Sequence, residues 1–310
     1  KKNTQGIIQQ WMDRYYKYNS KSWEVDILSK RIIAWISNTK LTYEDGTSQY
    51  QKSFNGVIKK QINFLINEID RSEWVDDKLI GCSAIILAGL SYQDKDNYLN
   101  KGLDLLKKFV KFSLNNDGFP KSRNIRQLNF YLKYFILIRE WLKESQSEIP
   151  DYINENIYYL GQAYAFTWKN NKVDLLFNGN HEAKNNDFDH YLKKLGYNFK
   201  SENNEIGGYA ILNNKKHSLI MDVGASPDKK FSSNYQAGAL SFEIISNGKK
   251  LICNSGYYQD YNHQLNDLSK SSAIHSSLII DDTSSCKFNK TKNKSSKITQ
   301  NLKILKKNIV

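Results

Sequence analysis

The chain has 310 residues, of which 40% are hydrophobic and 13% aromatic, and it carries a formal net charge of +13. This composition excludes a disordered chain, and the length is sufficient for two domains that each have a core. The longest nearly continuous apolar run, Leu79–Leu90, spans 12 residues, whereas a membrane-spanning helix needs about 20. We therefore expect no transmembrane segment.

The positive charge is concentrated near the carboxyl end. Residues 166–286 carry 13 basic and 13 acidic side chains, whereas residues 287–310 carry eight lysines and no acidic residue. Such a segment suits an acidic polymer, either a uronate polysaccharide or a nucleic acid, or it keeps a strand edge soluble. The neutral middle of the chain argues against an extended nucleic-acid-binding surface, so nucleic acid is the least favoured partner.

Residues 1–165 are predicted to be helical. Apolar residues recur at helical spacing in seven segments, at residues 7–15, 23–36, 57–69, 79–90, 99–114, 128–142 and 151–163. Pro150 precedes the last segment, which is compatible with a helix start. Successive amphipathic helices of this kind fit either an (α/α) toroid or an irregular bundle.

After Ala165 the pattern changes to short β-type runs that are separated by Asn and Gly. The first predicted strands are Phe166–Trp168, Val173–Phe177, Gly208–Leu212 and Ser218–Val223, and a short helix is expected at Asp187–Leu195. We therefore place a domain boundary near Ala165, with a helical domain at residues 1–165 and a β-sheet domain at residues 166–310.

The segment from Asn234 to Phe288 combines strand patterns, turn glycines and tyrosines. Leu240–Ile245 alternates apolar and polar residues, Asn247-Gly248 is typical of a tight hairpin turn, and Lys250–Cys253 is predicted as the next strand.

A third strand is predicted at Ser277–Ile280, two residues after His275. The three strands would place polar residues near neighbouring strand ends, where a rigid sheet can hold them together. These residues are Asn234, Gln236, Asn254 and His275.

Three motifs in this segment resemble the heparinase II/III-like family of polysaccharide lyases. They are Ala239-Leu240-Ser241-Phe242-Glu243, Asn254-Ser255-Gly256 and Ala273-Ile274-His275-Ser276-Ser277-Leu278. In the helical half, Asp117-Gly118 and Ser122-Arg123-Asn124 resemble a loop of the family. The resemblance implies an α+β multidomain fold, in which an incomplete (α/α) toroid precedes an antiparallel β-sandwich or β-sheet domain. We expect the C-terminus to be truncated.

By the same resemblance, the protein would cleave an acidic, uronate-containing polysaccharide by β-elimination, in a cleft between the helical and β domains. This reaction needs a base, a group that neutralises the sugar carboxylate, and an acid. The family's first histidine falls on Asn234, its helical-loop tyrosine near Gln127, and its Asn-His pair near Asp76-Asp77. These replacements leave a non-catalytic glycan-binding or cell-envelope protein as the alternative.

His275, Asn234 and Tyr235 are the catalytic candidates, and the alternative for His275 is a histidine that is hydrogen-bonded to backbone. The candidates for substrate binding are Arg123, Asn124, Arg126, Gln236, Tyr257 and Tyr258. The arginines would hold a carboxylate through paired hydrogen bonds or form a salt bridge at a helix end. The tyrosines would contact sugar rings or pack at the rim of the sheet.

The family's zinc positions fall on Gln236, Asn254 and His275. Amide oxygens are poor zinc ligands compared with imidazole and carboxylate, so we expect no cofactor and no zinc. Analogy with the family suggests a periplasmic or cell-envelope location, although Lys1–Gln10 contains no apolar signal-peptide region.

Overall fold

The structure is a computed structural model that describes the whole chain except residues 93–96, 170–171, 183–185, 291–295, 301 and 304–310. The chain forms two compact units. Unit 1 comprises Lys1–Phe112 and Lys133–Asn154, and unit 2 comprises Ser113–Leu132 and Glu155–Val310.

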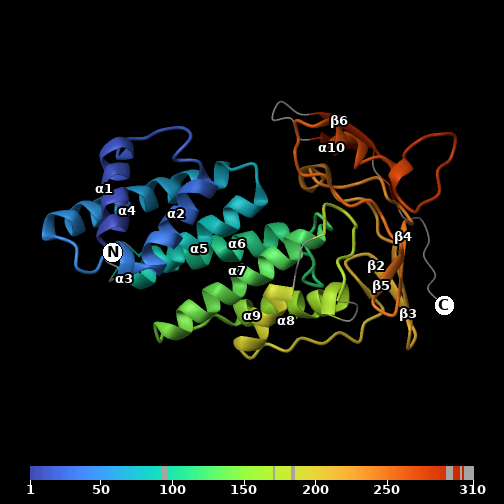
Figure 1. Cartoon of the computed structure of the whole chain (residues 1–310), viewed down its shortest axis with the longest axis horizontal. Helices are drawn as coiled ribbons and strands as arrows, with labels where there is room; N and C mark the ends of the chain where they lie inside the picture. Colours follow the sequence, from blue (N-terminus) through green and yellow to red (C-terminus); the bar gives the residue numbers. More distant parts are fainter. Residues whose placement is uncertain (93–96, 170–171, 183–185, 291–295, 301, 304–310) are drawn as a thin grey trace. The chain divides into compact units, whose positions relative to one another are not determined.

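Unit 1 is helical, as the apolar periodicity predicts. Its helices are α1 (Lys2–Tyr15), α2 (Val25–Ser37), α3 (Thr39–Thr42), α4 (Ser48–Glu68), η1 (Ile69–Arg71), α5 (Val75–Ser91) and α6 (Tyr98–Ser113) (Figure 1). The apolar run in α5 is buried from Leu79 to Gly89, because α2 and α4 both pack against this helix. The short helix α3 lacks a full amphipathic period and was not predicted.

Further helices follow in α7 (Ile125–Glu144), α8 (Asp151–Tyr164) and α9 (Asn186–Lys194). The predicted strand Phe166–Trp168 is wrong, because α8 continues into a π-helical turn, η2 (Ala165–Lys169). Within this turn, the Thr167 hydroxyl donates to the carbonyl oxygen of Ala163 at 2.9 Å.

The predicted strand Val173–Phe177 is also wrong. Its backbone finds side-chain partners in place of a neighbouring strand. The amide of Leu176 donates to Glu243 Oε1 at 3.0 Å, and Asn180 Nδ2 donates to the carbonyl oxygen of Leu175 at 2.7 Å. Periodicity alone does not reveal these long-range contacts.

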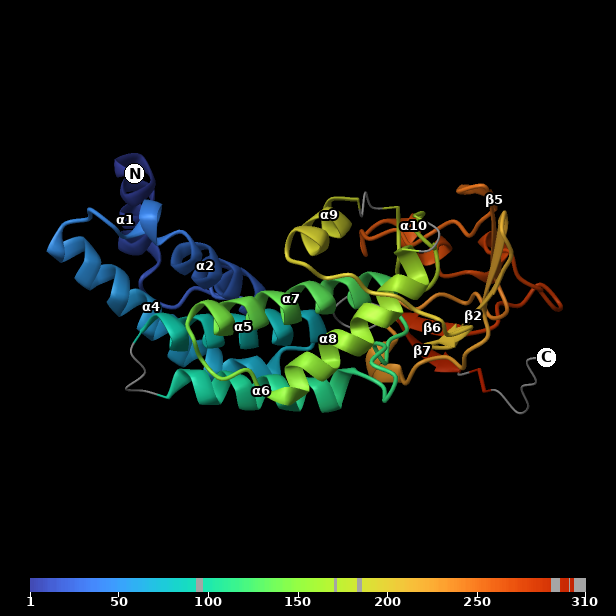
Figure 2. The same cartoon turned by 90° about the horizontal axis from the view of Figure 1, so that it is seen from below.

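Unit 2 contains a five-stranded antiparallel sheet whose strands lie in chain order. The strands are β1 (Glu205–Ile206), β2 (Tyr209–Asn213), β3 (His217–Asp222), β4 (Phe242–Ser246) and β5 (Lys249–Ile252). Strands β2 and β5 are labelled in Figures 1 and 2. The predicted strands 208–212, 218–223, 240–245 and 250–253 correspond to β2–β5. The turn between β4 and β5 is confirmed, since Asn247 and Gly248 have φ values of 50° and 73°.

The sheet buries one face. Tyr209, Ile211, Ile220 and Ile245 are at most 3% exposed, and Ile211 pairs directly with Ile220 across β2 and β3. Directly opposed residues point to the same side of a sheet, so these side chains form a shared apolar layer.

A separate two-stranded sheet is formed by β6 (Lys287–Lys290) and β7 (Ser296–Gln300). Short helical turns lie in η3 (Lys229–Phe231), α10 (Gln264–Leu268) and η4 (Ser272–Ile274). The third predicted strand, Ser277–Ile280, is wrong, because Ile280 makes only an isolated bridge to Thr283 and Leu278 is 72% exposed. The segment has strand-like residues but no strand to pair with.

The fold class is therefore confirmed as α+β, with a helical amino-terminal region followed by antiparallel sheet. No helix in the described part of the chain is long and apolar enough to cross a membrane.

Candidate functional site

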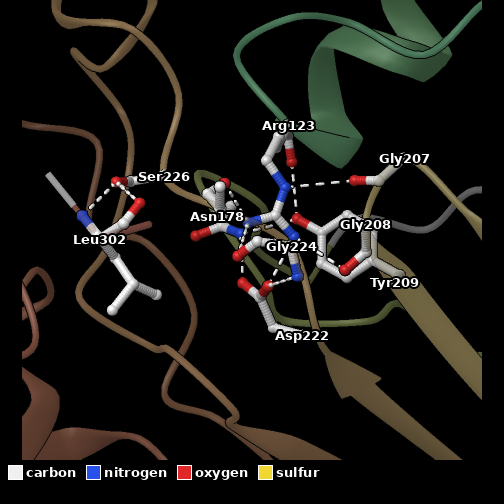
Figure 3. Close-up of polar contacts among 10 residues, drawn as sticks. Arg123, Asn178, Gly207, Gly208, Tyr209, Asp222, Gly224, Ser226 and Leu302 are labelled. Atoms are coloured by element: carbon white, nitrogen blue, oxygen red, sulfur yellow. Dashed lines mark hydrogen bonds and ion pairs between the residues drawn. The ribbon is translucent and has the colours of Figure 1, made fainter. Parts of the chain in front are cut away.

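Arg123 is the centre of a buried polar network in unit 2 (Figure 3). It lies just before α7 with a φ of 60°, and only 6% of the residue is exposed. Nε donates to the carbonyl oxygen of Gly207 at 3.1 Å, and Nη1 donates to Gly224 and Ala225 at 3.2 and 3.0 Å. Nη2 donates to the carbonyl oxygen of Gly208 at 2.9 Å.

The remaining donor of Nη2 forms an ion pair with Asp222 Oδ1 at 2.5 Å. All five guanidinium N–H groups therefore have partners within the chain. The expectation that Arg123 binds substrate is corrected, because no donor is left for a ligand carboxylate. The alternative, a salt bridge next to a helix end, describes Arg123 better.

Asp222 is equally well satisfied. Its Oδ2 accepts from Asn178 Nδ2 at 2.8 Å, and the same Nδ2 donates to the Tyr209 hydroxyl at 2.7 Å. The Tyr209 hydroxyl in turn donates to the carbonyl oxygen of Arg123 at 2.6 Å. Burial raises the pKa of Tyr209, so this hydroxyl stays protonated and the network is fixed.

Asn124, the next residue, differs from Arg123 because one of its polar atoms has no hydrogen-bond partner. Oδ1 accepts from the backbone amides of Arg126 and Gln127 at 2.9 and 3.3 Å, which caps the start of α7. Nδ2 is buried and has no hydrogen-bond partner. A Cβ on Gly179 would lie 2.4 Å from this nitrogen and 3.0 Å from the Cβ of Asn234, so both asparagines border the same glycine.

Asn234 is held by two tyrosines. Its Oδ1 accepts from the Tyr261 hydroxyl at 2.7 Å and from the Tyr257 hydroxyl at 3.3 Å. The Tyr257 oxygen accepts from Asn266 Nδ2 at 3.0 Å, which leaves its proton for Asn234. We call Asn234, Tyr257, Tyr261 and Asn266 the Asn234 cluster.

The Asn234 cluster fixes the direction of one amide. Because both tyrosines bind the oxygen of Asn234, its two Nδ2 hydrogens point away from them, and no described residue accepts them. Asn234 is partly exposed. The cluster therefore presents an oriented amide donor, which suits a carboxylate oxygen.

The two tyrosine positions differ in environment. Tyr257 is 5% exposed, and burial followed by its neighbour Tyr261 raises its pKa. Tyr261 is less buried. Tyr258 is 41% exposed, and its ring centroid lies 5.1 Å from that of His263, so its ring is available at the surface.

Positive charge lies next to the cluster. Lys270 is 2% exposed and donates from Nζ to the carbonyl oxygen of Ser233 at 2.7 Å. Its Nζ lies 5.8 Å from the ring centroid of Tyr257. Arg126, predicted to bind substrate, acts electrostatically on both Tyr257 and His181.

His181 and Asn266 were not predicted as site residues. Burial, followed by the charge of Arg126, lowers the pKa of His181, and its ring lies 2.8 Å from Gln259 Nε2. His181 follows Asn180, whose carbonyl oxygen accepts from the amide of Tyr257 at 2.8 Å. An isolated histidine or asparagine carries no sequence signal for this proximity.

The degenerate zinc positions do not form a metal site. Gln236 uses its oxygen for the amide of Gly179 at 3.1 Å and its nitrogen for the carbonyl oxygens of Gly256 and Ser269. Asn254 Oδ1 accepts from the backbone and hydroxyl of Ser276, both at 3.2 Å. Among the described residues, no three His, Cys, Asp or Glu side chains are grouped to hold a metal. Gln236 likewise keeps no group for a substrate.

His275 lies beside these residues, and both of its ring nitrogens are buried without a hydrogen-bond partner. Burial lowers its pKa to about 4, so the ring is neutral at pH 7. The backbone of Ser269 acts on the ring as a hydrogen-bond partner and opposes this lowering, although neither ring nitrogen meets the geometry of a regular hydrogen bond. A neutral imidazole is the correct form for a base, but its nitrogens are covered.

Tyr235 belongs to the hydrophobic core and is 1% exposed, in a cluster with Ala237, Cys286 and Ile298. Its hydroxyl is buried without a partner, and burial raises its pKa well above the ordinary value. The expectation that Tyr235 acts in catalysis is corrected, because a covered hydroxyl of raised pKa neither reaches a substrate nor transfers a proton readily.

Comparison with known proteins agrees with these motifs. Residues 200–307 match the family described as heparinase II/III-like, C-terminal. No curated protein sequence matches the chain.

Solved structures share the fold. A heparinase III crystal structure matches with a TM-score of 0.72 at 16% identity, over 92% of this chain and 52% of that one. A heparan sulfate lyase from Pedobacter heparinus matches with a TM-score of 0.67 at 16% identity, over 93% of this chain and 52% of that one. This chain thus spans about half the length of these structures. Residues 200–307 are therefore similar to the C-terminal domain of heparinase II/III-like proteins, and the solved structures, at 16% identity, share the fold of this chain.

Proposed function

We propose that the protein is a lyase that cleaves a uronate-containing polysaccharide by β-elimination, with the Asn234 cluster binding the uronate. The observation that carries this proposal is the oriented amide of Asn234, whose oxygen is occupied by Tyr257 and Tyr261. An amide donor that meets the sugar carboxylate stabilises the negative charge that develops when the neighbouring carbon loses its proton. The family match and the shared fold support this class of reaction.

Within the proposal, Tyr261 moves the proton. Its deprotonated oxygen takes the proton from the carbon next to the uronate carboxylate, and the resulting phenol gives it to the glycosidic oxygen, which leaves as the carbon–carbon double bond forms. Tyr261 donates to Asn234 and is less buried than Tyr257, so its hydroxyl is the one in the cluster that a substrate reaches. Arg126 and Lys270 add positive charge near the carboxylate and favour an acidic sugar. Tyr258 supplies an exposed ring for a neighbouring sugar.

The likeness also supports three wider expectations. The helices would form the incomplete toroid of the family, the sheet would form a layer of a β-sandwich, and the protein would act on its polysaccharide in the periplasm or cell envelope. The domain boundary near Ala165 is a separate prediction from the sequence.

A non-catalytic glycan-binding protein is the second candidate, and a specific observation favours it. The family's histidine is replaced by Asn234, and the remaining imidazole, His275, has covered nitrogens and a pKa of about 4. A site with a carboxylate-binding amide but no accessible base would bind the polymer without cleaving it.

The experiment that separates the two candidates is an elimination assay with heparan sulfate and other uronate polymers. The unsaturated uronate product absorbs in the ultraviolet. We expect Asn234→Ala to lower kcat/KM by about 100-fold or more, as the loss of a charge-stabilising donor does, and Asn234→Asp to lower it further because its carboxylate repels the uronate.

The matched control is Tyr258→Phe, since no hydrogen bond of the Tyr258 hydroxyl is part of the cluster, and its activity should equal that of the wild type. Tyr261→Phe should abolish turnover while polymer binding persists. Binding of a uronate polymer without any product from the wild type would reject the lyase and establish the glycan-binding alternative.

A further inference from the structure

A second group of unsatisfied donors lies in unit 1, around Arg31 of α2. Nη1 of Arg31 donates to the carbonyl oxygen of Ser22 at 2.9 Å, and Nε donates to Gln61 Oε1 at 3.4 Å. The guanidinium carbon lies 4.0 Å from the ring centroid of Trp11. Nη2 is buried and has no partner.

Gln61, on α4, also has a buried donor without an acceptor. The residue is fully buried, and its oxygen is occupied by Arg31. Its Nε2 has no acceptor. Two donors that both lack an acceptor are therefore neighbours, linked by the bond between Arg31 and Gln61. A buried donor without an acceptor costs free energy, so the pair is incomplete as it stands.

The charge of Arg31 is also unbalanced. Among the described residues, no carboxylate forms a salt bridge with it, and the nearest acid on its own helix, Asp26, pairs with Lys30 at 3.1 Å. Burial alone lowers the pKa of Arg31 to about 10, which leaves it positively charged at neutral pH. A cation that is partly withdrawn from solvent in this way is normally paired.

We propose that Arg31 and Gln61 bind an oxyanion, namely the carboxylate or sulfate group of an acidic saccharide. One anion oxygen accepts from Arg31 Nη2 and a second accepts from Gln61 Nε2, and the ring of Trp11 covers the guanidinium. The anion site stands on this geometry, whereas its assignment to a saccharide rests on the proposed function. Both nitrogens are buried in this structure, so anion binding requires a local rearrangement around Arg31 and Gln61.

The test is thermal unfolding of the full chain in sodium sulfate, sodium glucuronate, sodium chloride of equal ionic strength, and glucose. Sulfate, glucuronate or both should raise Tm by roughly 5–10 °C at about 100 times Kd, and the active salt identifies the anion. Chloride and glucose should not. Arg31→Met, which keeps an apolar stem, and Gln61→Leu should lose the response.

Two further variants make the test specific. Lys30→Met removes a neighbouring charge that is already paired and is 58% exposed, so it should keep the response. Gln61→Glu replaces the unpartnered Nε2 with a carboxylate oxygen, which supplies an acceptor and a negative charge next to Arg31. It should raise Tm without added anion and remove the response to sulfate or glucuronate.

The proposal is overturned if neither anion shifts the wild-type Tm beyond the chloride control, or if Arg31→Met and Gln61→Leu respond like the wild type. If Arg31→Met does not fold, the Tm responses of Gln61→Leu and Gln61→Glu to the anions still test the site. An anion response in a protein that yields no elimination product would reject the proposed lyase but leave this site intact.

Discussion

At the scale of single residues, the polar side chains of unit 2 differ in whether their hydrogen-bonding atoms are already used. Arg123 and Gln236 satisfy every polar atom within the chain, whereas Asn234 and Asn124 retain amide donors. The sequence could not separate the two groups, because the decisive partners are distant. Asp222, for example, lies 99 residues from Arg123.

His275 should make stability depend on pH. Its folded-state pKa is about 4 against an ordinary value of 6.5, so the unfolded chain takes up the proton first. Stability is therefore full above about pH 6.5 and is lost as the pH falls towards 4. We expect the stability advantage of the wild type over His275→Gln to shrink between pH 7 and pH 5, measured by urea unfolding.

The comparison has to be made between the two proteins at each pH, because Asp77 titrates in the same range. Burial, helped by Asp26, raises the pKa of Asp77 to about 6. A raised carboxyl pKa acts in the opposite direction, since stability then falls as the pH rises towards 6. A difference between wild type and His275→Gln that is constant from pH 5 to 7 would contradict the assigned pKa.

At the scale of elements, local periodicity was sufficient to predict an element whose backbone hydrogen bonds are formed within the element or with the next strand along the chain. The long helices of unit 1 and the hairpin at Asn247-Gly248 were predicted for this reason. Residues 173–177 and 277–280 have strand-like composition but no adjacent strand. In the first of these segments, the side chain of Glu243 accepts the backbone hydrogen bond of Leu176. Strand pairing is a property of two segments, so one segment cannot specify it.

The ion pair of Arg123 and Asp222 should be essential to unit 2, because it joins the loop before α7 to the turns that flank β2 and β3. Arg123→Met leaves Asp222 as a buried, unpaired carboxylate, which should lower the free energy of unfolding by about 3–5 kcal/mol. The measurement is chemical denaturation.

The matched control for this prediction is Arg71→Met. Arg71 is 76% exposed and bonds Glu68 at 2.7 Å on the surface, where a pair contributes about 0–1 kcal/mol. Equal stability losses in the two variants would show that the buried network of Arg123 is dispensable.

At the scale of the whole molecule, the sequence predicted a helical region followed by antiparallel sheet, and this order is confirmed. The motifs around Asn254 and His275 lie in the same segment of the chain as the proposed site. They did not identify Tyr261 and Asn266 as partners of Asn234, since membership of the Asn234 cluster depends on side-chain direction in three dimensions. Residues 113–132 group with the sheet although their sequence reads as part of the helical region.

The charge distribution gives a final prediction, on polymer binding. The net charge is +13, and residues 287–310 hold eight lysines without an acid. Exposed charges are screened by salt, whereas the oriented amide of Asn234 acts at short range. Affinity for a uronate polymer should therefore fall as salt rises, and replacing Lys297 and Lys303 with Gln should flatten this dependence.

Asn234→Ala provides the contrast, because it removes a hydrogen bond but no charge. It should weaken binding by a similar factor at every salt concentration and leave the slope unchanged, which titration of the polymer at several ionic strengths would reveal. If the lysine variant kept the wild-type slope, the electrostatic attraction would have to come from other cations of the chain, such as Arg126 and Lys270 next to the Asn234 cluster. The proposed site itself, and not Lys297 and Lys303, would then select the acidic polymer.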